Sequence, residues 1–214
     1  MARQAKRFVI GITGASGTVY GERLVEVLLE KGHSVDLVVT RAGYLVGSQE
    51  LGWPPVRDFD RDSSQLLKRL DQVGTGRLRL YHWEAIDAPI ASGSVAVDGV
   101  VIIPASMASI AAIATGQSGN LLERAADVAL KEGRPLIVVP RETPLNRIHL
   151  RNLLTLAEAG ATVMPAMPGF YHKPVAVRDL VDFMVGKVLN RLGLEQELLP
   201  PYTNSPESSE EDLK

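Results

Sequence analysis

"FVIGITGASGTVYGERLVEVLLEKGHSVDLVVT", residues 8–40, contains a complete strand–helix–strand pattern. The apolar run 8–12 predicts a buried strand, and residues 34–40 predict a second one. Between them the sequence predicts a helix over about 18–31, which Gly32 ends. The apolar face of this helix holds Tyr20, Leu24, Val27 and Leu28. Nearly continuous apolar strands connected by helices are typical of a parallel sheet that is covered on both faces.

The same pattern repeats along the chain. Further strands are predicted at 99–104, 135–140 and 161–166. Further helices are predicted at 106–116, 121–132, 143–160 and 175–192. In the third of these, Thr143 is the expected N-cap, Pro144 the first helical residue and Gly160 the end. The order of elements within residues 52–98 is left open.

These elements predict an α/β fold, a Rossmann-like doubly wound parallel sheet that binds ligands at the carboxyl ends of its strands. We expect one domain over residues 1–202. Residues 203–214 are polar and acidic, with the sequence "TNSPESSEEDLK". We expect a disordered tail there.

Composition excludes several classes of function. The chain has 23 basic and 25 acidic residues and a formal net charge of −2, which argues against general nucleic-acid binding. It has no cysteine, so disulfides, thiolate metal sites and cysteine nucleophiles are excluded. The four histidines form no cluster with metal-ligand spacing, and we expect no metal site. No apolar run is long enough for a membrane span, so we expect a soluble, cytoplasmic protein.

Small and polar residues follow the first predicted strand, in "GITGASG". Gly11, Gly14 and Gly17 are spaced by three, which matches neither the dinucleotide fingerprint nor a P-loop. Two interpretations remain open. The next helix could offer free N–H groups to a phosphate, or the loop is a tight turn in which Ser16 caps that helix.

The second and third strands also end in polar residues. Thr40 ends the second strand, and the helix beyond it brings Glu50, for which a solvated carboxylate is the ordinary interpretation. Ser106 and Ser109 open the alanine-rich helix after the third strand. They are helix caps or leave room for a flat ring, and the sequence does not decide between the two.

The fourth strand ends in "PRETP", where Glu142 is favoured near a helix N-terminus. The positive charge of Arg141 is unfavourable near a helix N-terminus unless an anion binds there. This favours a functional role for Arg141. The fifth strand ends in a loop that carries Tyr171, and prolines and a glycine restrict the conformation of this loop. Elsewhere, Arg124 and Lys131 lie seven residues apart and share a helix face, most simply as a solvated stripe.

Five motifs in one order and spacing carry a family resemblance: "TGASG", "PASMASIAAIATG", "NLLERAADVALKE", "VPRETPLNRIHLRN" and "PGFYHKP". From about residue 8 to 202 the chain resembles the flavin prenyltransferase family of the UbiX type. The resemblance implies transfer of a dimethylallyl group from dimethylallyl phosphate to N5 and C6 of reduced FMN. It implies that the product, prenylated FMN, serves UbiD-type decarboxylases. It also implies a metal-independent homododecamer with sites at subunit interfaces.

The resemblance also assigns residues. It places FMN contacts at Gly14, Ala15, Ser16, Thr40, Ser106, Met107, Ala108, Ser109 and Arg141. It places contacts to the prenyl phosphate at Arg124, Lys131, Tyr171, Lys187 and Tyr202. It gives catalytic roles to Ser16, Glu50 and Glu142, with Glu50 as a proton carrier and Glu142 orienting Ser16. Two positions depart from some members, which have arginine at Lys187 and a tryptophan lid at Tyr202.

Other functions fit the sequence less well. A pantothenoylcysteine-type decarboxylase would share a "PASMAS"-like stretch, but its active-site cysteine is absent here. A non-catalytic FMN-binding protein would have no use for the cationic set of Arg124, Lys131 and Lys187. The glycine spacing disfavours a nicotinamide oxidoreductase, and no clear carboxylate-binding site supports an aromatic-acid decarboxylase.

Overall fold

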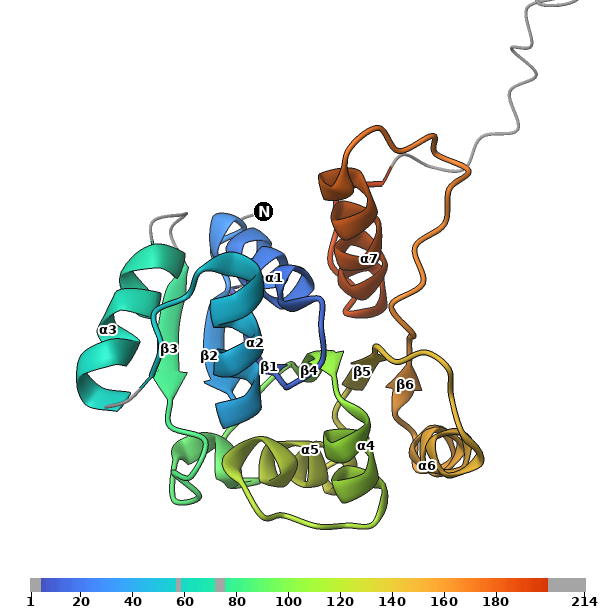
Figure 1. Cartoon of the computed structure of the whole chain (residues 1–214). Helices are drawn as coiled ribbons and strands as arrows, with labels where there is room; N and C mark the ends of the chain where they lie inside the picture. Colours follow the sequence, from blue (N-terminus) through green and yellow to red (C-terminus); the bar gives the residue numbers. More distant parts are fainter. Residues whose placement is uncertain (1–4, 57–58, 72–75, 200–214) are drawn as a thin grey trace, which may run out of the picture.

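The computed structural model describes residues 5–56, 59–71 and 76–199 (Figure 1). Within them, six strands form one sheet in the order β3-β2-β1-β4-β5-β6, and every neighbouring pair is parallel. The strands are β1 (Arg7–Ile12), β2 (Ser34–Val39), β3 (Arg77–Tyr81), β4 (Gly99–Ala105), β5 (Leu136–Pro140) and β6 (Thr162–Val163). The order runs outward from β1 in one direction and then from β4 in the other. This confirms the predicted doubly wound fold.

Helices cover both faces of the sheet (Figure 1). One face packs against α1 (Thr18–Glu30), α2 (Arg41–Leu51), α3 (Phe59–Leu70) and α7 (Val177–Arg191). The other packs against η1 (Pro89–Ala91), α4 (Met107–Ala114), α5 (Leu121–Lys131) and α6 (Arg147–Glu158). No helix among the described residues is long and apolar enough to cross a membrane.

Strand β4 shows why the apolar runs are nearly continuous. All seven of its residues are buried, because helices lie on both sides of it. Val101 and Ile103 join the core under α1 and α7, whereas Val100 and Ile102 join the core under α5. Successive side chains of a strand point to opposite faces, so a central strand needs an apolar residue at every position.

The prediction for the helix at 143–160 was wrong at its start. Helix α6 begins at Arg147, and Asn146 is its N-cap, accepting from the N–H of His149 at 2.9 Å. The His149 ring faces the Asn146 N–H in return, at 3.4 Å. Thr143 does not cap a helix, because it lies in the loop before Asn146; its own N–H donates to Glu142 Oε1 at 2.9 Å. A reciprocal asparagine cap therefore sets the boundary, and Pro144 lies in the preceding loop.

The fifth predicted strand is shorter than expected. Strand β6 spans two residues rather than 161–166, although Met164 and Ala166 still donate to carbonyls of β5 at 2.9 and 3.0 Å. Pro165 lies between these two donors on the edge strand, where the N–H that it lacks would point away from β5. The region left open in the sequence holds α3, β3 and η1. The predictions for Tyr202 and residues 203–214 lie outside the described residues.

Candidate active site

The loops after β1 and β4 are joined at the carboxyl edge of the sheet by Thr13, which is fully buried. Its N–H and its hydroxyl both donate to the Pro104 carbonyl, at 3.2 and 2.8 Å. The same hydroxyl accepts from the N–H of Ser106 at 2.7 Å. Thr13 thus fixes the "TGASG" loop against the start of α4. Thr13 is not among the residues predicted from the sequence, although a threonine directly after a buried strand was the available signal.

Glu50 reaches from the end of α2 to the start of α1. The Gly17 N–H donates to its two carboxylate oxygens, at 3.2 and 3.0 Å, and the Thr18 N–H donates at 3.0 Å. Burial favours the protonated form, but hydrogen bonds from the Ser16 side chain and these N–H groups outweigh it and lower the Glu50 pKa. Glu50 is therefore held as a carboxylate at the positive end of a helix.

This contact corrects three expectations from the sequence. Glu50 is not a freely solvated helix-end carboxylate. The N–H groups of Gly17 and Thr18 are not free for a phosphate, because Glu50 takes them. Ser16 does not cap α1, whose N-cap is Gly17 without a side-chain cap bond. A residue thirty-two positions away caps this helix, which no local pattern predicts.

Arg141 ties the loop after β5 to the same place. Its Nε donates to the Ser16 carbonyl at 3.0 Å, and its N–H donates to the Ala105 carbonyl at 3.3 Å. Ser16 thus lies between the Glu50 carboxylate and the Arg141 guanidinium. Glu142 is exposed and bonds to Thr143, so its role in orienting Ser16 stays a prediction.

Two hydroxyl residues cap helices here. The cap at Ser106 is one of the two interpretations that the sequence left open, and the cap at Thr40 was not predicted. Thr40 accepts from the Gly43 N–H at 3.1 Å, and Ser106 accepts from the Ser109 N–H at 3.2 Å. The loop after β1 lies directly against α2, because a Cβ built on Gly14 would be 2.5 Å from the Ala42 Cβ. Small residues, hydroxyls and backbone donors thus surround the carboxyl ends of β1, β2 and β4. They fit the flavin that the resemblance implies.

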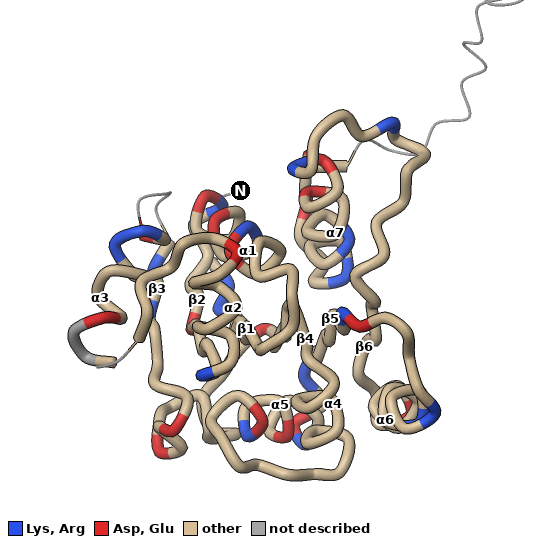
Figure 2. The backbone as a smooth tube through the Cα atoms, viewed as in Figure 1, with Lys and Arg blue, Asp and Glu red and all other residues tan. Residues whose placement is uncertain are grey.

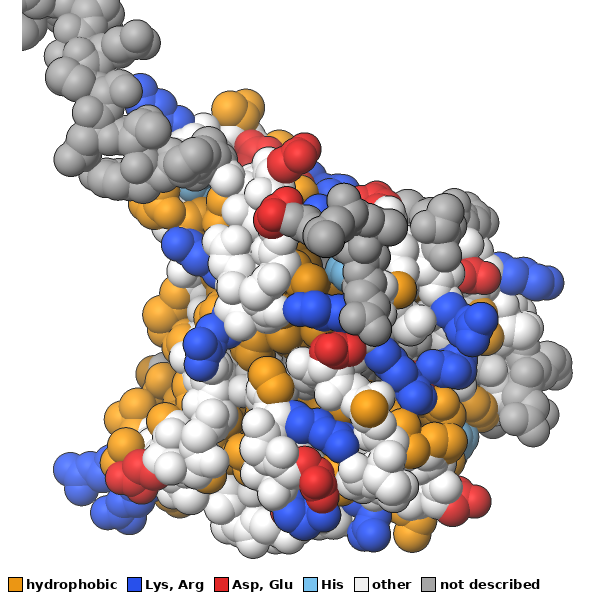
Figure 3. Space-filling view, turned by 180° about the vertical axis from the view of Figure 1, so that it is seen from behind, with side chains coloured by type: hydrophobic (Ala, Val, Ile, Leu, Met, Phe, Trp, Pro, Cys, Tyr) orange, Lys and Arg blue, Asp and Glu red, His pale blue; other side chains and the backbone are white. Residues whose placement is uncertain are grey.

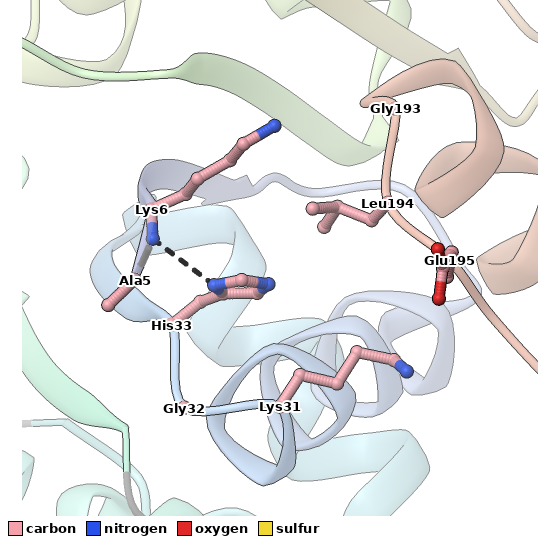
Figure 4. Close-up of a pocket in the computed structure, with 8 residues that line it drawn as sticks. All are labelled: Ala5, Lys6, Lys31, Gly32, His33, Gly193, Leu194 and Glu195. Atoms are coloured by element: carbon pink, nitrogen blue, oxygen red, sulfur yellow. Dashed lines mark hydrogen bonds between the residues drawn. The ribbon is translucent and has the colours of Figure 1, made fainter. Parts of the chain in front are cut away.

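A cavity of about 550 Å³ opens beside this loop. It is lined by Arg41, Ala42, Tyr44, Leu45, Ser48, Pro55 and Val56. Another cavity, of about 530 Å³, lies between the starts of β1 and β2 and the end of α7 (Figure 4). There the Lys6 N–H donates to His33 Nδ1 at 3.2 Å. Because those segments begin rather than end strands, the second cavity lies away from the Ser16 cluster.

The predicted phosphate contacts fall into two groups. Tyr171 and Lys187 both lie against Phe183 of α7, with Tyr171 at 5.6 Å between ring centroids and Lys187 Nζ at 5.4 Å from the centroid. Arg124 and Lys131 lie on α5, where the Lys131 ammonium pairs with Glu132. Helices α5 and α7 cover opposite faces of the sheet, so one chain does not bring all four residues together.

Charged residues of both signs are distributed over the helices (Figure 2). Among the described residues, no group of three or more histidine, aspartate or glutamate side chains is placed to hold a metal ion. Neither observation identifies a second catalytic centre. The cluster of Ser16, Glu50 and Arg141 is therefore the candidate active site.

Comparison with known proteins identifies the family of this chain. Residues 2–189 match the family model named Flavoprotein. The flavin prenyltransferase UbiX of Halalkalibacterium halodurans is 50% identical over 191 residues, which cover 89% of this chain and 90% of the relative. That of Synechocystis is 44% identical, covering 89% and 93%.

A solved structure of AnUbiX (PadA1) in complex with FMN and dimethylallyl pyrophosphate has a TM-score of 0.83 and 32% identity. It covers 94% of this chain and 100% of its own. The named relatives favour neither the cysteine decarboxylase nor the non-catalytic alternative. The chain belongs to the Flavoprotein family and, within it, to the flavin prenyltransferases of the UbiX type.

Proposed function

We propose that this protein transfers a dimethylallyl group from dimethylallyl phosphate to N5 and C6 of reduced FMN and releases prenylated FMN. The observation that carries the proposal is the cluster of Ser16, Glu50 and Arg141 at the carboxyl edge of the sheet. It belongs to a chain 32% identical to a structure that holds FMN and dimethylallyl pyrophosphate.

The flavin site is proposed to consist of the loop after β1 and the starts of α2 and α4. Its residues are Gly14, Ala15, Ser16, Thr40, Ser106, Met107, Ala108, Ser109 and Arg141. The first N–H groups of α4 have no partner within the helix, and Met107 and Ala108 can offer theirs to a polar ligand. When bound, reduced FMN supplies the nitrogen and carbon that receive the prenyl group.

Glu50 is proposed to move a proton during the reaction. Its lowered pKa means that it is ionised at neutral pH and starts as a proton acceptor. The Ser16 side chain also lowers this pKa, and its hydroxyl is proposed to exchange a proton with the carboxylate. Glu142 is kept as a further catalytic candidate from the next loop.

The departing phosphate is proposed to be held by Arg124, Lys131, Tyr171 and Lys187, with Tyr202 over the prenyl group. Cations and a phenol hydroxyl stabilise the charge that gathers on a leaving phosphate. Because the sheet separates α5 from α7 within one chain, we propose that two copies contribute to each site. A structure from Escherichia coli O157:H7, 36% identical with a TM-score of 0.76, is described as a dodecameric FMN-dependent UbiX-like decarboxylase.

Exposed apolar side chains support assembly of this chain. Ile148 and Leu154 of α6 are 64% and 58% exposed, and Phe170 and Val175 in the next loop are 69% and 96% exposed. Figure 3 shows hydrophobic side chains at the surface among scattered lysines and arginines. Such residues favour contact with another protein surface, and we propose a homododecamer.

The wider assignments complete the proposal. Residues 1–202 are taken as one catalytic domain, with 203–214 as an acidic tail outside it. The product is assigned to UbiD-type decarboxylases, and the protein to the cytoplasm. Addition of the released flavin to such a decarboxylase lacking its cofactor tests the first of these two assignments, and restored decarboxylation is the expected result.

The main experiment is anaerobic incubation with reduced FMN and dimethylallyl phosphate, followed by mass spectrometry of the released flavin. We expect a protein-dependent mass gain of one five-carbon prenyl unit. Recovery of unmodified FMN, with the pyrophosphate donor also tried, would favour a flavin-binding protein or another flavoenzyme. The two donors compared under equal conditions decide which phosphate ester is used.

A mixing experiment tests the shared site. Lys131→Ala and Lys187→Ala are each expected to be nearly inactive as homo-oligomers. If each site takes Lys131 from one copy and Lys187 from another, random co-assembly leaves about one quarter of sites with both lysines. The co-expressed pair should recover about that share of wild-type turnover. No recovery in verified mixed oligomers would place both lysines of a site on one chain.

A further inference from the structure

The loop "PGFYHKP", residues 168–174, and helix α7 meet at one aromatic ring. His172 stacks on Phe183, with centroids 5.1 Å apart and planes at 18°. Tyr171 meets the same ring edge-on at 74°, and Lys187 Nζ lies 5.4 Å from its centroid. Phe183 is buried, whereas Tyr171 and Lys187 are exposed. A buried ring thus supports two exposed polar groups.

The backbone of the loop is fitted to this arrangement. A Cβ on Gly169 would be 2.9 Å from the Tyr171 ring and 3.1 Å from Phe183 Cζ, so only glycine allows the approach. Lys173 has a φ of 53°, a left-handed conformation that costs free energy in a residue with a side chain. Its N–H donates to the Phe170 carbonyl at 3.0 Å, which closes the turn around His172.

The His172 ring contributes its flat face rather than its nitrogens. Both ring nitrogens are buried, and neither has a hydrogen-bond partner among the described residues. A half-buried imidazole whose two nitrogens are buried without a partner is costly compared with an apolar side chain. The His172 ring stacks on Phe183 and makes an edge contact with Tyr171.

We propose that His172 is a positioning residue, which holds the Phe183 ring so that Tyr171 and Lys187 converge on one phosphate group. An ammonium is attracted to the face of an aromatic ring, and a fixed ring limits the many conformers of a lysine side chain. The inference rests on the proposed function, because only there do these two residues share a phosphate ligand. His172 itself transfers no proton in this scheme.

The test compares His172→Ala, which removes the stack, with His172→Phe, which keeps a flat ring and removes the nitrogens. We expect His172→Ala to raise KM for dimethylallyl phosphate about fivefold, the size of an exposed cation–π contact, with little change in kcat or FMN affinity. His172→Phe should restore the wild-type KM. An unchanged KM in His172→Ala, or an equal defect in His172→Phe, would overturn the proposal.

His82 provides a matched control, since it stacks on Trp83 at 4.0 Å and is also half-buried. His82→Ala should leave KM for the prenyl phosphate unchanged. If His172→Ala fails to fold, Phe183→Leu keeps an apolar side chain without the aromatic face. It should raise the same KM, and a wild-type KM in that variant counts against the proposal.

A readout without turnover separates this proposal from the proposed function. In wild type, dimethylallyl phosphate should slow acetylation of Lys187 by acetic anhydride, measured by peptide mass spectrometry against Lys31. The protection should be reduced in His172→Ala and kept in His172→Phe. If Lys187 is protected in this pattern but no prenylated flavin forms, the positioning role is supported and the transferase activity is refuted. If prenylated flavin forms but Lys187 is equally protected in all three proteins, the transferase activity is supported and the positioning role is refuted.

Discussion

Replacement of Glu50 by glutamine tests the candidate active site most directly. The carboxylate accepts from the N–H groups of Gly17 and Thr18, at 3.0 to 3.2 Å, and from the Ser16 side chain. An amide keeps one oxygen acceptor and turns an NH₂ toward these donors. The change is close to isosteric, so it removes charge and proton transfer while keeping the shape of the site.

The size of the stability effect follows from the bonds. Hydrogen bonds to a charged group contribute about 1.5–3 kcal/mol and neutral ones about 0.5–1.5 kcal/mol. Since the Gly17 contact is exposed, we expect Glu50→Gln to lose about 1–2 kcal/mol in total, which lowers Tm by about 2–8 °C in a chain of this size. The protein should remain folded and bind FMN.

Turnover should fall much further than stability. Loss of a general acid or base costs about 10²–10⁴-fold in rate, equivalent to about 2.7–5.5 kcal/mol. The assay is the rate of prenylated FMN formation under anaerobic conditions, with FMN affinity measured by quenching of flavin fluorescence. Glu158→Gln, at the exposed end of α6, is the control and should match wild type. Turnover of Glu50→Gln within about threefold of wild type would refute the proton-transfer role.

Three further predictions follow from the same region. Gly14→Val should abolish FMN binding, because its Cβ would lie 2.5 Å from that of Ala42, and normal flavin retention on gel filtration would contradict a flavin site at the loop after β1. Arg141→Met should weaken FMN binding about tenfold in a fluorescence titration, since it removes a cation and its bond to Ser16; an unchanged Kd would exclude a flavin contact. The Glu50 pKa is lowered from 4.5, so its stabilising effect is present above pH 4.5 and is lost as pH falls through the lowered pKa. The difference in free energy of unfolding between wild type and Glu50→Gln should therefore shrink below pH 4.5, and a constant difference would contradict the ionised contact.

Local patterns in the sequence predicted most strands, and they offered the cap at Ser106 as one of two interpretations. Ser106 caps its helix through the N–H group three residues on. The same approach misplaced the start of α6, because Thr143 precedes a proline and looks like a cap. Asn146 offered an equally local signal and is the stronger capping residue, so that error was avoidable.

The presence of β1, β2, β4, β5 and β6 and the kind of residue at the end of each were determined by the sequence alone, whereas β3 and the order of the strands in the sheet came from the structure. Hydrophobic periodicity depends on spacing along the chain, and the carboxyl ends of parallel strands necessarily share one edge. The pairing of side chains across that edge was decided only by the tertiary structure. Glu50 meets Gly17 across 33 residues, Arg141 meets Ser16 across 125, and the sheet keeps Lys131 from Lys187. Such contacts depend on the conformation of each loop and on the face of the sheet that each helix covers. Spacing along the sequence determines neither of these.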